Sequence, residues 1–169
     1  MVPMRIMGID PGLATVGYGI IDYYKNEFKT FDYGAVLTAA GKKTELRLEE
    51  IYENIEELIK TSNPDAVSIE KLYFNTNEKT AVNVCQARGV ILLAATRNKI
   101  PVFEYTPLQI KQAVTGYGRA EKKQIIYMVT KILNLKKEPT PDDTADALAM
   151  AICHAYCSDS MLFEMKERS

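Results

Sequence analysis

Four carboxylates in this 169-residue sequence stand at the ends of predicted strands or on a helix, in a set that suits metal-dependent phosphate chemistry. Asp10 and Glu70 each close a short apolar run, and Asp143 and Asp146 are three residues apart on a predicted helix, so they share one face. Carboxylates gathered in one site repel one another unless cations lie among them. Oxygen ligands in a chain with one histidine favour two Mg²⁺ ions, or Mn²⁺, over zinc. The predicted chemistry is two-metal hydrolysis of a phosphodiester.

Each acid also has an ordinary structural explanation. Asp10 precedes Pro-Gly and suits a turn, and Glu70 could be a surface charge at a strand end. Asp143 follows a threonine by three residues and could complete a capping box. Asp146 is the hardest to explain structurally, because a carboxylate among alanines and leucine is costly when buried unpaired. Asp142, four residues before Asp146, competes with Asp143 for a place in the site.

Two hydrophobic periodicities predict a mixed α/β domain. Runs rich in β-forming residues come first, and later apolar residues recur at helical spacing. Thr106-Pro107 predicts a helix start, and Gly116 predicts its end. The element order β-β-β-α-β-α-β-α predicts an antiparallel meander followed by β-α-β units, hence a mixed five-stranded sheet with helices on both faces. The strands are expected at Arg5–Asp10, Thr15–Ile21, Phe28–Leu37, Ala66–Glu70 and Pro101–Tyr105, and the last helix is expected to end near Tyr156.

Composition indicates a cytoplasmic globular protein. The chain is 47% hydrophobic and 25% charged, and no apolar run approaches the roughly 20 residues that span a bilayer. Three cysteines, an odd number, favour a reducing compartment over a disulfide framework. We expect a single domain over residues 1–157 with a C-terminal tail at 158–169. Cys153, His154 and Cys157 are read as structural residues, because no second ligand pair accompanies them.

The net charge of −1 hides two oppositely charged regions. Seven basic residues and one acid lie between Lys111 and Lys137, and six acids and one base lie between Glu45 and Glu57. The basic region could hold phosphates, although a solvated helix face explains the same count.

Nine blocks of the sequence form a characteristic set: Gly8–Gly12, Gly17–Gly19, Ile69-Glu70, Gln86–Val90, Pro101–Tyr105, Lys111-Gln112, Gly116–Gly118, Ala120–Lys122 and Asp143–Ala149. Together and in this order, they resemble the RuvC family of bacterial Holliday junction resolvases. They cover nearly the whole chain to about Tyr156, and a single block such as the first would be weak because other RNase H-like proteins begin similarly.

The resemblance implies an RNase H-like fold, a homodimer whose interface is the helix Thr80–Asn98, and symmetric cutting of a four-way DNA junction in recombination and repair. It assigns catalysis and metal binding to Asp10, Glu70, Asp143 and Asp146, and it favours Asp143 over Asp142. Partnership with the RuvA and RuvB branch-migration proteins also follows only from the resemblance. The implied DNA contacts are Lys111, Lys122 and, secondarily, Lys123, with Tyr73 or Phe74 as an aromatic wedge at the crossover.

Two other functions fit part of the sequence. RNase H-like nucleases of the YqgF type act on RNA and share the opening strand, but they lack the Gln86–Val90 and Lys111–Lys122 blocks. An actin-like nucleotide-binding module begins similarly, but it needs a second domain that 169 residues cannot supply.

Overall fold

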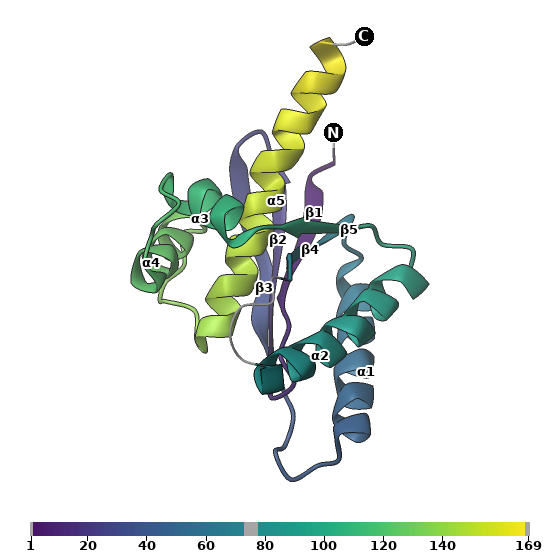
Figure 1. Ribbon diagram of the computed structural model, residues 1–169. Coiled ribbons are helices and arrows are strands. Elements are labelled where there is room, and N and C mark those ends of the chain that lie inside the picture. The colour runs from purple at the N-terminus through teal and green to yellow at the C-terminus, as the bar shows by residue number, and fades with distance from the viewer. Residues whose placement is uncertain (1, 73–77, 168–169) are drawn as a thin grey trace.

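Five strands form one mixed sheet with helices on both faces (Figure 1), as the sequence pattern predicts. The computed structural model describes residues 2–72 and 78–167. The sheet order is β3-β2-β1-β4-β5, with β1, β2 and β3 antiparallel and with β4 parallel to both β1 and β5. The elements are β1 Met4–Asp10, β2 Thr15–Tyr24, β3 Glu27–Leu37, α1 Thr44–Ser62, β4 Ala66–Glu70, α2 Glu78–Arg97, β5 Val102–Tyr105, α3 Pro107–Thr115, α4 Lys122–Ile132 and α5 Asp142–Glu167.

The β2–β3 hairpin is longer than its sequence suggests. The polar stretch from Asp22 to Glu27 predicts a connection, but β2 continues to Tyr24 and the turn contains only Lys25 and Asn26. Both turn residues have positive φ, 49° and 64°, which matches the tight hairpin turn whose twist suits the flanking strands. The expectation of a longer loop was wrong because Asp22 is a strand residue with a partner.

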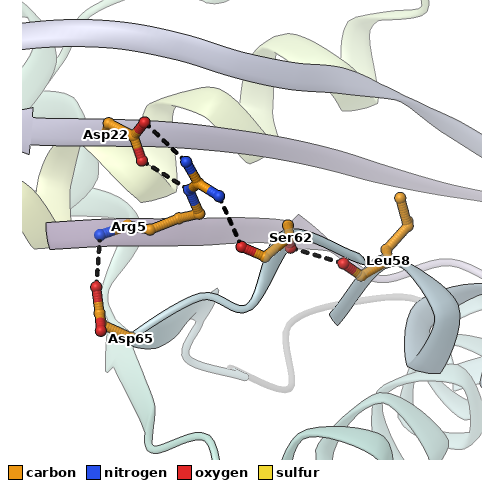
Figure 2. A network of polar contacts seen from close by, with 5 residues as sticks. All are labelled: Arg5, Asp22, Leu58, Ser62 and Asp65. Carbon is orange, nitrogen blue, oxygen red and sulfur yellow. Dashed lines mark hydrogen bonds and ion pairs between the residues drawn. The ribbon is translucent and has the colours of Figure 1, made fainter. Parts of the chain in front are cut away.

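That partner is Arg5 on β1, which joins three segments of the chain (Figure 2). Its guanidinium donates to both carboxylate oxygens of Asp22, at 2.7 and 3.0 Å, and to the carbonyl of Ser62 at the end of α1, at 2.8 Å. Its backbone N–H donates to the Asp65 carboxylate at 2.7 Å, just before β4 begins. These bonds hold the starts of β1 and β4 together, so that both strands end at the same edge of the sheet.

Alternation along the strands separates the side chains into two cores. Met7 and Ile9 of β1 and Val67 and Ile69 of β4 belong to the core that α1 and α2 cover. Ile6 belongs to the opposite core, which α3, α4 and α5 cover. Residues 8 and 10 of β1, and residues 68 and 70 of β4, therefore face α5.

Helix α5 crosses the sheet unusually closely (Figure 1). A Cβ added to Gly8 would lie 1.9 Å from the carbonyl oxygen of Ala147, so only glycine permits the contact. The Ser68 hydroxyl donates to the Met150 carbonyl at 2.7 Å and adds a polar tie between β4 and the helix. The sequence predicts a helix end near Tyr156, but α5 runs on to Glu167, because no glycine or proline interrupts it.

Within the described residues, no helix is both long enough and apolar enough to cross a membrane.

Candidate active site

Asp10 and Glu70 emerge side by side at one edge of the sheet. Each is the last residue of its strand, and the parallel pairing places Ile9 opposite Ile69 immediately before them. Both side chains face α5, by the alternation described above. The strands β1 and β4 are neighbours in the sheet, which is the condition under which two strand-end acids share one edge.

The first turns of α5 bring two further acids to this edge. A Cβ on Gly17 would lie 2.0 Å from the Asp143 carbonyl oxygen, so the helix starts directly against β2. The capping box suggested for Asp143 is not formed. The helix begins at Asp142, so the threonine lies one position too early to cap it.

A cavity of about 270 Å³ opens between these elements. Three of the four predicted acids line it, together with two of the predicted basic residues and an apolar wall from α3, α4 and α5. Asp143 does not line the cavity, although its charge acts on Asp10. The lining residues are Asp10, Glu70, Pro107, Ile110, Lys111, Lys122, Ile125, Asp146, Ala149 and Met150.

Burial and mutual repulsion make these carboxylates difficult to ionise. Burial, followed by the charges of Asp146, Asp143 and Glu70, raises the pKa of Asp10 to about 8. Burial and the charge of Asp146 also raise the pKa of Glu70, against the opposing effect of Lys111. The pKa of Asp146 is raised chiefly by burial. Without a bound cation, full ionisation of these carboxylates is therefore unfavourable at neutral pH.

Lys122 supplies part of the missing positive charge. Its ammonium group lies 2.9 Å from the Asp146 carboxylate and 3.7 Å from that of Asp142. Burial lowers the pKa of Lys122, but the hydrogen bond and charge of Asp146 outweigh it, so the pKa is raised. Lys122 starts α4, where Gln124 accepts a hydrogen bond from the Glu121 backbone at 2.8 Å and helps fix the helix start.

Carboxylate oxygens are suitable ligands for hard divalent cations, but the acidic side chains of the cavity are not close enough to one another to form a metal site. Among the described residues, no three Asp, Glu, His or Cys side chains form a group that could hold a metal ion. Lys122 engages one of the donors, Asp146. Ionised carboxylate oxygens in a partly buried, electron-rich pocket are the ligands that Mg²⁺ and Mn²⁺ prefer, so a bound cation would relieve the repulsion on Asp10.

Of the other predicted DNA-binding residues, the one that the structure describes does not line this cavity. Lys123 is exposed and points away from the cavity, into a separate hollow on the other side of α4. Tyr73 and Phe74 lie outside the described residues. Ile110 and Ile125, which form part of the cavity wall, were not predicted as site residues, since an apolar residue at helical spacing reads only as core.

The surroundings of His154 indicate a structural role. It is buried, and its Nδ1 lies 2.7 Å from the Tyr105 hydroxyl while its ring stacks on Phe103 with centroids 4.3 Å apart. Burial lowers its pKa to about 4, so it stays neutral at physiological pH. Cys153 and Cys157 are free thiols.

The sheet order, the two strand-end acids and the helix bearing Asp146 together define an RNase H-like nuclease. The family model described as crossover junction endodeoxyribonuclease RuvC matches residues 6–154. The chain belongs to the RuvC family of crossover junction endodeoxyribonucleases.

Individual members of the family are similar to this chain over most of their length. The RuvC of Clostridioides difficile is 58% identical over 153 residues, which are 90% of each chain. That of Alkaliphilus metalliredigens is 55% identical over 164 residues, 96% of this chain and 100% of the relative. The structure of Thermus thermophilus RuvC in complex with a Holliday junction substrate is similar, with a TM-score of 0.87 at 34% identity, and the match covers 92% of this chain and 94% of that one.

Proposed function

We propose that this protein resolves Holliday junctions by metal-dependent hydrolysis of DNA phosphodiesters in recombination and repair. The observation that carries the proposal is the cavity in which Asp10, Glu70 and Asp146 meet Lys111 and Lys122. Acids and lysines on one cavity suit a phosphodiester, because the acids can hold cations while the lysines meet phosphate oxygens. The T. thermophilus relative was solved with a Holliday junction substrate, which supports the same substrate for this chain.

We assign Asp10, Glu70, Asp143 and Asp146 as the ligands of two Mg²⁺ ions, or Mn²⁺. When bound, such ions polarise the phosphodiester and lower the pKa of the attacking water. The acids orient the reacting groups, and the apolar wall formed by α3, α4 and α5 limits the entry of water. Lys111 and Lys122 bind the phosphate near the scissile bond and offset its charge.

A homodimer would place two such sites on the two equivalent strands of a junction. Helix α2 supports this assembly, because its Val82 and Leu93 side chains are 55% and 51% exposed. By family membership we extend the proposal to a cytoplasmic location and to partnership with RuvA and RuvB. Either Tyr73 or Phe74 is the proposed aromatic wedge.

A synthetic four-way junction tests the proposal. With Mg²⁺ or Mn²⁺ the protein should nick two strands symmetrically, and Asp146→Asn should lower the cleavage rate at least about 100-fold while junction affinity stays within about threefold. Asp143→Asn should act like Asp146→Asn, whereas Asp142→Asn, whose side chain is mostly exposed, should cleave nearly normally. Cleavage of linear RNA with no cleavage of the junction would instead support an RNA nuclease.

A further inference from the structure

A second hollow, which we call the tyrosine hollow, lies on the side of α4 away from the acidic cavity. Its volume is about 380 Å³, and the proposed catalytic chemistry does not use it. Its lining comes from the end of α3, the connection to α4 and the first two turns of α4. The lining residues are Thr115, Tyr117, Ala120, Lys123, Gln124, Tyr127 and Met128.

Two aromatic side chains stand in water beside this hollow. Tyr117 is 57% exposed and Tyr127 is 54% exposed, while Ala120 beneath them is buried. Rings this exposed contribute little to the core, but each offers a flat π-face next to an apolar floor. A nucleobase is a ligand of matching shape, because base–aromatic stacking requires only such a face.

The charge around the hollow matches a nucleic acid strand. Lys123 lines it, and the ammonium of Lys131 lies over one face of the Tyr127 ring, 5.5 Å from its centre. The lining residues include no carboxylate. A cation over one face of a ring can pair with a backbone phosphate while the opposite face stacks on a base.

The hollow and the proposed cleavage site lie on opposite sides of α4. Consecutive residues of α4 face the two places: Lys122 reaches Asp146 in the acidic cavity, and Lys123 lines the tyrosine hollow. An α-helix with its side chains is about 10–12 Å across, which corresponds to roughly three base-pair rises of DNA. A strand held at Lys122 would therefore reach the hollow within a few nucleotides.

We propose that the tyrosine hollow binds the DNA strand a few nucleotides from the scissile phosphate, with bases stacked on Tyr117 and Tyr127 and the adjoining phosphate paired with Lys123. The inference rests on the proposed function, since it extends the DNA path of that site. It assigns base-stacking roles to two tyrosines beyond the proposed basic contacts and the wedge.

Paired substitutions separate stacking from simple apolar contact. In EDTA, where cleavage is suppressed, Tyr117→Leu and Tyr127→Leu should each weaken junction binding roughly fivefold, while the Phe variants stay within about twofold because they keep the π-face. Tyr24→Leu, at the end of the sheet far from the cleavage site, is the matched control, because a lysine also lies over the Tyr24 ring, and it should bind like the wild type. Lys123→Gln should lower the slope of log affinity against log salt by about one.

A fluorescent base analogue gives a second readout. 2-Aminopurine placed two to four nucleotides from the cut should be quenched when the wild-type protein binds, and the quenching should be lost in the Leu variants. Wild-type affinity and full quenching in both Leu variants would overturn the inference and leave the hollow to a protein partner. Failure of the wild-type protein to bind any junction would instead refute the proposed function.

Discussion

Replacing Asp10 by Asn should stabilise the metal-free protein, although Asp10 is a proposed metal ligand. In the folded chain, burial and three neighbouring acids raise the pKa of Asp10 from 3.8 to about 8. At pH 7 the unfolded chain carries Asp10 ionised, whereas the folded chain must keep it largely protonated. Asn has nearly the same shape and carries no charge, so the substitution removes this penalty.

The magnitude follows from the pKa shift. At pH 7 the solution lies roughly 3 units above the unfolded pKa, and about 1.4 kcal/mol per unit sets a ceiling of about 4 kcal/mol. Relaxation of the neighbouring acids and entry of water lower this, so we expect a gain of about 2 kcal/mol in the free energy of unfolding.

The pH dependence has a defined sign. Because the folded pKa is raised, the wild-type protein loses stability through Asp10 as the pH rises from about 4 to about 8. The advantage of Asp10→Asn should therefore be small at pH 5 and larger at pH 8. Glu70 and Asp146 also have raised pKa values, but they are present in both proteins and largely cancel in the comparison.

Urea unfolding in EDTA at pH 5 and pH 8, followed by circular dichroism, measures the difference. Asp142→Asn is the matched control, since its exposed side chain should change stability by less than about 0.5 kcal/mol. With saturating Mn²⁺ the order should reverse, because only the wild-type protein keeps the full ligand set. An Asp10→Asn protein that is no more stable than the wild type at pH 8 would refute the reasoning.

Two further substitutions test the electrostatics and the packing of the site. Lys122→Gln should raise the Mn²⁺ affinity of the free protein roughly twofold to fivefold, because it removes a partly exposed ion pair with the proposed ligand Asp146. Lys123→Gln should leave the Mn²⁺ affinity unchanged. Electron paramagnetic resonance measures Mn²⁺ binding in both variants, and equal affinities in the variants and the wild type would contradict the assigned contact. Gly8→Ala should destabilise the protein by about 3 kcal/mol or more, because its Cβ would collide with the α5 backbone, whereas Gly41→Ala meets nothing within 4 Å and should be nearly neutral in the same urea assay.

Local sequence patterns predicted the element order because they act through nearby residues. Apolar runs ended by turn residues marked β1 and β4, and the Thr106 cap and Gly116 marked the ends of α3. The errors were also local. Asp22 looked like a loop residue because its partner, Arg5, is 17 residues away in the chain.

The candidate site was only partly visible in the sequence. Asp10 and Glu70 could be placed at strand ends, but their proximity depends on β1 pairing with β4 rather than with another strand. Resemblance to a family, not spacing, favoured Asp143 over Asp142. The contact between Lys122 and Asp146 joins residues 24 apart on different helices, and no periodicity encodes it.

The sequence by itself therefore indicated candidate acids and the elements that carry them. Hydrophobic period and capping marked those elements, because both are local properties of the chain. Tertiary structure decided how three of those acids share one cavity, which lysine offsets their charge, and that Lys123 faces a different hollow. The physical reason is that pKa values and ion pairs depend on burial and distance through space. The close approach of α5 to the glycines of β1 and β2 determines how deeply the acids are buried and how far apart they lie.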